Sequence, residues 1–466
     1  MKVKIWQGIK SDGFWWWLII LVPIAGIFVI NLPSNWRLLS DIFSEKTPAN
    51  LDAKYRYQFS ESLRNNQNQK QAIEREIAFY QQRLAVDPKS GLNRSGLAAA
   101  YLKMARATGE GSRFLLAQQA AQRSIADLPF NNQGALLILA RIAEAKHDFS
   151  TALRLAEQVG FDNEDAIALT VTSHLATGNL SEANKSAEAL VNRIPNLGSL
   201  TLRALVREAQ GRDAEALEDF RQAMAAEEPG EVAGSARVRS LLGRFYARRG
   251  QFVQAKALFL EALRLVPRYP LALIYLADLE VRSGNYREAE SYYSKVSAYS
   301  GGAATAFDRA VKIGMARVKE LQGDAIAAQQ LRDKAEAGLR QELAAGGFGH
   351  RRDLARLLLE RGRSQDVAEA LALMQQEVKI RKDPLTLDTL AWALSSAGDW
   401  KGADRAIAPI VRSGFRDAGI FYRASAIARK LGKESESRIY LQKAKEIDPN
   451  FDARSGKYLG LGNLEF

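Results

Sequence analysis

The sequence predicts an all-α fold: a solenoid of about ten stacked helical hairpins that follows one N-terminal transmembrane helix. Two observations indicate this fold. A phrase of glycine, aromatic and alanine residues returns at intervals of about 31 to 41 residues, and a long apolar run without charge lies near the N-terminus. The composition agrees, because 47% hydrophobic and 25% charged residues supply enough apolar material for a long, continuous core.

The apolar run is predicted to be a transmembrane anchor over residues 13–36, after a short N-terminal segment over 1–12. No charged residue lies between Asp12 and Arg37, and a helix that crosses a bilayer needs roughly 20 apolar residues. Indole rings prefer the boundary between acyl chains and headgroups. Tryptophans stand at both ends of the run, at Trp15, Trp16, Trp17 and Trp36.

Two other interpretations of this run stay open. A cleavable signal peptide is disfavoured, because no pair of small residues with the spacing of a cleavage site follows Ile30. A helix buried in the core of a soluble protein is the third interpretation and the least favoured. The uncleaved anchor is therefore the favoured interpretation of this run.

The distribution of lysines and arginines predicts the orientation of the anchor. Lys2, Lys4 and Lys10 precede it, whereas only Arg37 and Lys46 follow within about 15 residues. The positive-inside tendency therefore places the N-terminus in the cytoplasm and the repeats on the periplasmic or luminal side of a single-pass membrane protein. The polar stretch at 37–69 then serves as a juxtamembrane connector.

Each repeat predicts two helices joined by a tight turn. The clearest copy has its turn at Gly250, an aromatic residue at Phe252, a small residue at Ala255 and a closing proline at Pro267. The alanine lets the two helices approach closely, the aromatic ring fills the wedge between them, and the proline ends the pair. The same turn is expected at Asp148, Gly178, Gly211, Gly284, Gly323, Gly398 and Gly432, with further closing prolines at Pro88, Pro129, Pro195, Pro229 and Pro449.

These positions resemble the tetratricopeptide repeat (TPR) superfamily, most closely where Gly243, Tyr246 and Phe259 accompany the Gly250 turn. The resemblance implies a right-handed superhelix over residues 70–449. The first unit and one near 352–380 depart from the pattern, and residues 450–466 are expected to form a C-terminal cap or tail.

The segment from Arg381 to Phe451 resembles the C-terminal repeats of many bacterial TPR proteins, so the chain looks like a membrane-anchored bacterial TPR protein. In those relatives a histidine commonly follows the tyrosine equivalent to Tyr422, whereas this chain has Arg423. The substitution puts in doubt any role that the histidine carries. The resemblance itself implies no reaction.

Charge and cysteine content limit the chemistry of the chain. Lysine and arginine number 65 against 53 acids, which gives a net charge of +12 and a pI near 9.6. Such a balance suits nucleic acid, an anionic membrane surface or an acidic protein. The chain has no cysteine, which excludes disulfides, thiolate metal sites and cysteine nucleophiles.

The search for an active site finds none, so no catalytic, metal-binding or cofactor-binding residue is predicted. Only His147, His174 and His350 occur, without metal-ligand spacing between any two. His147 is expected in a turn and His174 in packed surroundings. No phosphate-binding loop, nucleophile elbow or dinucleotide fingerprint is present. An acidic cluster in a Pro-Gly loop, Glu227, Glu228 and Glu231, is expected to be solvated.

Partner binding is expected on the concave surface, which the first helix of each hairpin lines in TPR folds. A row of guanidinium groups there can bind carboxylates with two hydrogen bonds each. The alternative is that these arginines only solvate a helical surface. The predicted residues are Arg141, Arg237, Arg244, Arg248, Arg317, Arg352 and Arg356.

The function predicted from these features is a membrane-anchored scaffold. It would bind protein or peptide partners, including ones with acidic segments, in envelope assembly, secretion or polysaccharide export. Two alternatives remain: an enzyme whose site lies in the irregular region 297–380, and nucleic-acid binding by the basic surface. Nucleic acid is not expected, because acids are interleaved along most helices and the repeats are predicted to face outward.

Overall fold

The structure, a computed structural model, describes residues 66–300, 305–344 and 350–451. The predicted N-terminal segment, the anchor at 13–36 and most of the connector lie outside the described residues, as does the tail beyond Phe451. Within the described ranges, no helix is long and apolar enough to cross a bilayer. The described residues form helices α3 to α23 and one isolated β-bridge, between Glu110 and Thr305.

Helix α3 (Asn66–Val86) packs on the first of ten helical hairpins in this part of the chain. The hairpins are α4 (Gly91–Thr108) with α5 (Gly111–Asp127), α6 (Gln133–Ala145) with α7 (Phe149–Val159), α8 (Glu164–Thr177) with α9 (Leu180–Arg193), α10 (Leu197–Ala209) with α11 (Asp213–Ala225), α12 (Val232–Ala247) with α13 (Phe252–Leu265), α14 (Pro270–Arg282) with α15 (Tyr286–Ser300), α16 (Ala306–Leu321) with α17 (Ala325–Ala344), α18 (Arg351–Arg361) with α19 (Ser364–Glu377), α20 (Pro384–Ser396) with α21 (Trp400–Ser413), and α22 (Ala418–Lys430) with α23 (Glu434–Ile447).

One turn geometry recurs in every hairpin. The second helix begins two residues after a residue with positive φ, a backbone conformation that glycine adopts at little cost. The predicted turns are confirmed, and two more appear in the units expected to be degenerate, at Gly109 and Gly362. In the hairpin of α6 and α7 the positive φ belongs to His147, at 62°.

Alanines allow the two helices of a hairpin to pack closely, as predicted. The alanine five residues after the turn has no exposed surface in seven hairpins; these are Ala152, Ala183, Ala216, Ala255, Ala289, Ala328 and Ala403. Gly243, on the facing helix, also allows close packing, because a Cβ there would lie only 2.5 Å from the ring of Phe259. The largest cluster of buried apolar residues runs without a break from α8 to α14.

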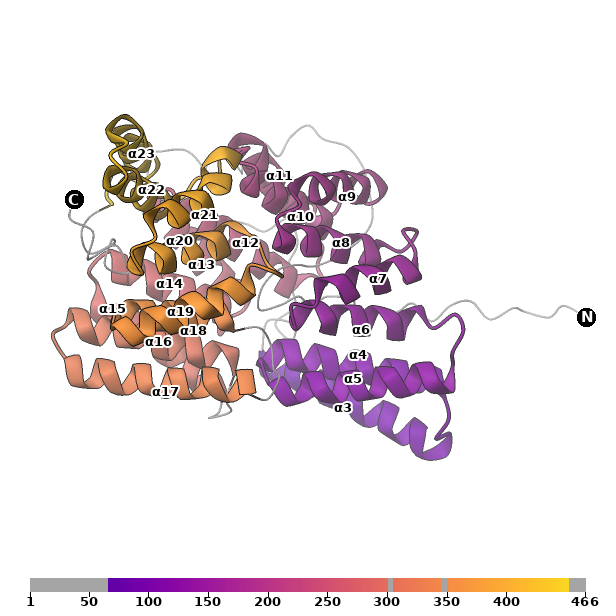
Figure 1. Ribbon diagram of the computed structural model, residues 1–466. Helices are drawn as coiled ribbons and strands as arrows, with labels where there is room; N and C mark the ends of the chain where they lie inside the picture. The colour runs from indigo at the N-terminus through magenta and orange to yellow at the C-terminus, as the bar shows by residue number, and fades with distance from the viewer. Residues whose placement is uncertain (1–65, 301–304, 345–349, 452–466) are drawn as a thin grey trace, which may run out of the picture.

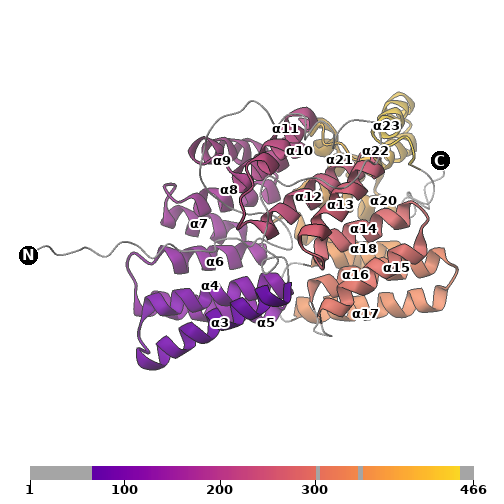
Figure 2. The same cartoon turned by 180° about the vertical axis from the view of Figure 1, so that it is seen from behind.

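The solenoid curls so that its later hairpins, from α18 to α23, lie beside earlier ones, from α6 to α14 (Figure 1). Seen from behind, α10 to α14 pass in front of the C-terminal helices (Figure 2). Contacts across this line join residues far apart in the sequence. The amide of Lys382 donates a 2.9 Å hydrogen bond to the carbonyl of Ala176, and Asp448 forms an ion pair with Arg282. We call this line of contacts the seam.

Candidate functional site

The seven predicted arginines all lie on, or directly after, first helices of hairpins. Arg141 is on α6, Arg237 and Arg244 are on α12 and Arg248 caps it; Arg317 is on α16, and Arg352 and Arg356 are on α18. Because the solenoid closes on itself, their surface is not an open concave face. The side chains of Arg141 and Arg237 are buried, and the side chain of Arg317, at 23%, is among the more exposed. We call this enclosed, charged region the arginine interior.

One group of arginines surrounds Glu144 on α6. The Nη2 of Arg141 donates to Asp165, and Arg106, Arg141 and Arg237 all act on the Glu144 carboxylate. Burial raises the pKa of Glu144 to about 7, although these cations and a hydrogen bond from Thr172 oppose the shift. Burial also lowers the pKa of Arg237 to about 10. The surroundings of this group therefore disfavour charge of either sign.

The α12 arginines share an acid from the neighbouring hairpin. Glu208, which is 4% exposed, lies 3.7 Å from Arg244 and 3.3 Å from Arg248. The segment from Arg237 to Arg249 contains no acid, so its counter-charges come from other elements, among them Glu208 on α10 and Asp213 on α11. The pKa of Glu208 is lowered, because burial, which acts against its charge, is outweighed by these guanidinium groups.

A second group lies on α16 and α18. Arg317 pairs with Glu360, and Arg352 lies 3.2 Å from Asp383. Arg356 is half-buried, with its guanidinium 5.9 Å from the ring centre of Trp392. Within the described residues no carboxylate lies within ion-pair distance of Arg356. Burial lowers the pKa of Arg356, and Arg317 lowers it further, whereas Asp388 and Glu360 act against the shift.

Sequence reasoning missed the acids and one arginine of this interior. Arg106 stands three residues before its turn, the position that Glu144 and Glu208 hold in their own hairpins. The predicted Arg141 and Arg244 stand six residues before theirs. These two positions lie one helical turn apart on one face. A search of both positions in every hairpin would have found Glu144 and Glu208.

The expectation that the acidic cluster near Pro229 is solvated was wrong. Glu227 and Glu231 are 3% and 4% exposed. Glu227 binds the buried Arg239 at 2.8 Å, and Glu231 accepts a hydrogen bond from the amide of Glu228. Burial raises the pKa of Glu231 to about 8. Pro229 and Gly230 are exposed, as a Pro-Gly loop predicts, but Glu227 and Glu231 on either side of them are buried.

His147 links the seam across two distant hairpins. Its Nδ1 lies 3.1 Å from a carboxylate oxygen of Glu377, and its Nε2 lies 3.1 Å from a guanidinium nitrogen of Arg381. Because the arginine can only donate, Nε2 accepts and Nδ1 carries the proton that Glu377 receives. Burial lowers the pKa of His147, in agreement with a neutral ring. The prediction that His147 occupies a turn is confirmed.

Arg423, which follows Tyr422, is a buried structural residue. It is 1% exposed, its Nε donates to Asp388 at 2.7 Å, and its guanidinium lies 5.0 Å from the ring centre of Trp392. The two partners lie on α20 and Arg423 on α22. Arg423 therefore joins two successive hairpins.

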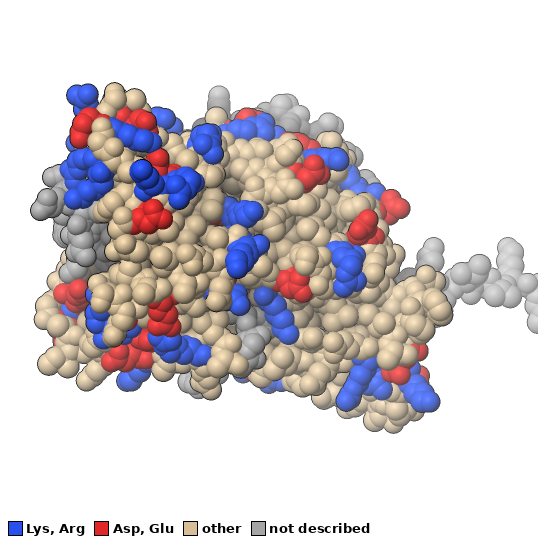
Figure 3. Space-filling view, viewed as in Figure 1, with Lys and Arg blue, Asp and Glu red and all other residues tan. Residues whose placement is uncertain are grey.

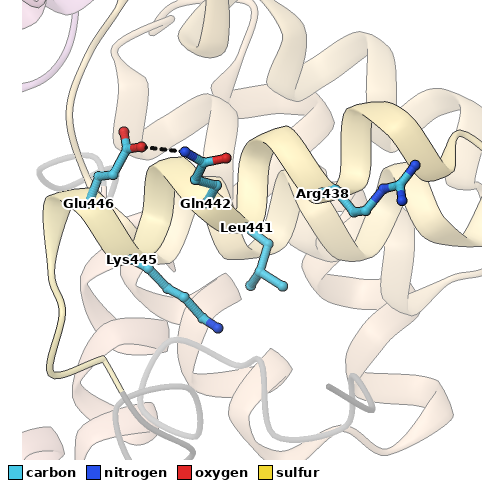
Figure 4. Close-up of a pocket in the computed structure, with 5 residues that line it drawn as sticks. All are labelled: Arg438, Leu441, Gln442, Lys445 and Glu446. Atoms are coloured by element: carbon cyan, nitrogen blue, oxygen red, sulfur yellow. Dashed lines mark hydrogen bonds between the residues drawn. The ribbon is translucent and has the colours of Figure 1, made fainter.

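The described part of the surface has two further features, a gathering of basic side chains and a shallow hollow. On the face seen in Figure 1, blue side chains gather near the centre, where the two halves of the solenoid meet (Figure 3). A hollow along α23 is lined by residues of that helix alone, and Gln442 donates to Glu446 within it (Figure 4). Within the described residues, no group of three or more histidines and acids is arranged to hold a metal ion. The described parts of region 297–380 belong to regular hairpins.

Comparisons with known proteins find a family match for the last hairpin. Residues 418–451 match the sequence model of the Tetratricopeptide repeat family. Among solved structures, the human IFIT1 dimer with PPP-AAAA is 15% identical, with 88% of this chain and 93% of that chain covered and a TM-score of 0.43. Yeast Tom70 is 11% identical, with 81% and 89% covered and a TM-score of 0.37. No curated protein sequence matches this chain.

Proposed function

From the premise that this chain is a helical repeat protein of the tetratricopeptide type, and hence a scaffold for protein interaction, we propose that it is anchored in a membrane and binds acidic segments of its partners. The anchor is the uncharged run at 13–36. The binding site is the arginine interior. The repeats then act on the periplasmic or luminal side, in envelope assembly, secretion or polysaccharide export.

The observation that supports acidic partners most directly is that no carboxylate of the described residues lies within ion-pair distance of Arg356. Arg317 and Arg352 both oppose the charge of Arg356, whose guanidinium lies beside the ring of Trp392. A carboxylate supplied by a partner would relieve this repulsion and form a charge-assisted hydrogen bond. Arg244, at 22% exposure, would be a second contact, since Glu208 is shared among several arginines.

Binding of a glutamate-rich peptide by the full-length protein in detergent tests the site. Arg356→Gln and Arg244→Gln are each expected to weaken binding about tenfold, the effect of one lost charge-assisted hydrogen bond. Arg405→Gln is the matched control, because Arg405 is exposed on α21. Binding should also weaken with salt. If all three variants and the parent bind the peptide with equal affinity, the proposal that the arginine interior binds acidic segments is wrong.

The natural partner can be identified by capturing it from solubilised membranes. The parent and the Arg356→Gln variant are purified side by side, and the proteins retained are identified by mass spectrometry. Proteins retained only by the parent, with acidic segments, are the expected result. Flotation of the full chain with vesicles after an alkaline wash tests the anchor separately, since an integral span resists that wash. Recovery of the chain in the aqueous fraction would reject the anchor.

A further inference from the structure

Exposed apolar side chains concentrate at the N-terminal end of the solenoid. Of the ten large hydrophobic side chains exposed within the described residues, seven lie between Phe79 and Phe161. Four of the seven stand at the connections between hairpins, or at the helix ends beside them. They are Val86 at 88%, Leu92 at 71%, Phe130 at 79% and Phe161 at 58% exposure.

These four side chains lie along one edge of the molecule. The connections from α3 to α4, α5 to α6 and α7 to α8 follow one another along the right-hand edge in Figure 1 and the left-hand edge in Figure 2. The second helices α5 and α7 end on this side, whereas these N-terminal hairpins meet the seam through their opposite turns, such as the turn of His147, where first helices end. The apolar edge, defined as Val86, Leu92, Phe130 and Phe161, is therefore not covered by the closure of the solenoid.

Hydrogen bonds hold the three connections side by side. The hydroxyl of Ser124 donates to the carbonyl of Gly91 at 2.6 Å, and Asn132 donates to Ser124 at 2.9 Å. Gln133 donates to the carbonyl of Val159 at 3.2 Å. The apolar edge is therefore a fixed row on a rigid support rather than a set of independent loops.

We infer that the apolar edge inserts into the interfacial region of the bilayer to which the chain is anchored, and this inference rests on the proposed anchor. Lipid is favoured as the occupant because the edge belongs to the first hairpins after residues 37–65. Those residues, about 29 in number, can span at most roughly 95 Å. Isolated phenylalanine and leucine side chains that protrude from a polar edge suit insertion among headgroups and upper acyl chains.

Charge contributes little to this contact. Arg94 pairs with Asp127, and Arg193 lies 3.8 Å from both Asp162 and Glu164. The ions beside the apolar edge therefore largely compensate one another. Insertion is expected to depend weakly on salt and on the fraction of anionic lipid, unlike binding through a basic patch.

The absence of cysteine makes the test direct. Single cysteines replace Phe130 or Phe161 in the full-length protein and carry an environment-sensitive fluorophore. Ile326→Cys and Val253→Cys are the controls, because both positions are exposed, at 76% and 63%, near turns on the opposite edge. The protein is reconstituted into vesicles of zwitterionic lipid, with and without lipids that carry a quencher at a shallow depth.

Labels at 130 and 161 are expected to emit at shorter wavelength and to be quenched several-fold more than labels at 326 and 253. Emission at 130 and 161 like that of the controls, in a chain that floats with the vesicles, would overturn the inference while leaving the anchor intact. Failure of the chain to float would remove both. Insertion that requires anionic lipid and vanishes in salt would point to a basic patch and also overturn it.

Discussion

Gly211, in the turn between α10 and α11, lies directly against the backbone of Gly414, which ends α21. A Cβ on Gly211 would overlap the carbonyl group of Gly414. Both residues have positive φ, 72° and 79°. The turn glycine thus has two purposes: it permits the tight turn within its own hairpin, and it lets a hairpin from the other half of the chain approach at the seam.

Gly211→Ala is therefore expected to destabilise the protein more than the same change at Gly323. Both turns have positive φ, which costs an alanine about 1–2 kcal/mol. A Cβ on Gly323 meets no atom within 4 Å, so that variant bears the conformational cost alone. At Gly211 the clash is with backbone, which adds about 1–3 kcal/mol. Thermal unfolding measures the difference, and equal Tm values would show that close packing of Gly211 on Gly414 does not contribute to stability.

The contrast between these two glycines explains how far the sequence could predict the fold. Turns, small packing residues and closing prolines are local, so a pattern within one hairpin is enough to find them. The seam joins residues such as Ala176 and Lys382. Its position depends on the pitch of the whole superhelix, which sums small rotations between hairpins. No pattern within a single hairpin shows the total rotation, so the seam could not be predicted from the sequence.

The same reasoning applies to the arginine interior. The face that carries Arg244 could be predicted, because it depends on helical periodicity within one helix. Its partner Glu208 could not be paired with it in the same way, since that contact depends on how α10 and α12 stack. Enclosure of the face was missed for the same reason as the seam.

The three histidines are expected to titrate in a set order, which hydrogen exchange at the imidazole C2 position can measure by mass spectrometry. Burial lowers the pKa of His147 and of His174. The pKa of His350 is raised, because Asp353 and Glu342 outweigh the burial that acts against its charge. His350 should therefore be the last of the three to lose its proton as the pH rises. A pKa of His147 above that of His350 would contradict the arrangement at the seam.

The lowered pKa of His147 also predicts how the stability of the protein changes with pH. The folded pKa of His147 lies below its unfolded value near 6.5. Its contribution is complete above pH 6.5 and is lost as the pH falls through the lowered pKa. The protection factors of the amides of Glu377 and Arg381, which correct the exchange rate for its intrinsic dependence on pH, should therefore fall on acidification. His147→Asn should remove most of this dependence, whereas His174→Asn, away from the seam, should leave it.

Replacement of Arg423 is expected to disturb the joint between the last two hairpins. Arg423→Leu leaves Asp388 buried, at 4% exposure, without its guanidinium partner. Removing one member of a buried ion pair costs about 3–5 kcal/mol. The double variant with Asp388→Leu should recover part of the loss, because no buried charge remains. Thermal unfolding of both variants measures this, and additive losses would mean that the two side chains do not act as a pair.

Glu231→Gln is expected to stabilise the protein at alkaline pH. Burial raises the folded pKa of Glu231 to about 8, well above the unfolded value near 4.3. The protonated carboxyl contributes fully below pH 4.3, and this contribution is lost as the pH rises through 8. Glutamine stays neutral and keeps an oxygen to accept the hydrogen bond from the amide of Glu228.

The Tm of the variant should therefore fall less than the Tm of the parent between pH 5 and pH 8, by an amount equivalent to more than ~1 kcal/mol. Glu434→Gln, at an exposed position on α23, is the control, and a Glu231→Gln profile that follows the parent would show that the loop of Glu231 opens to water.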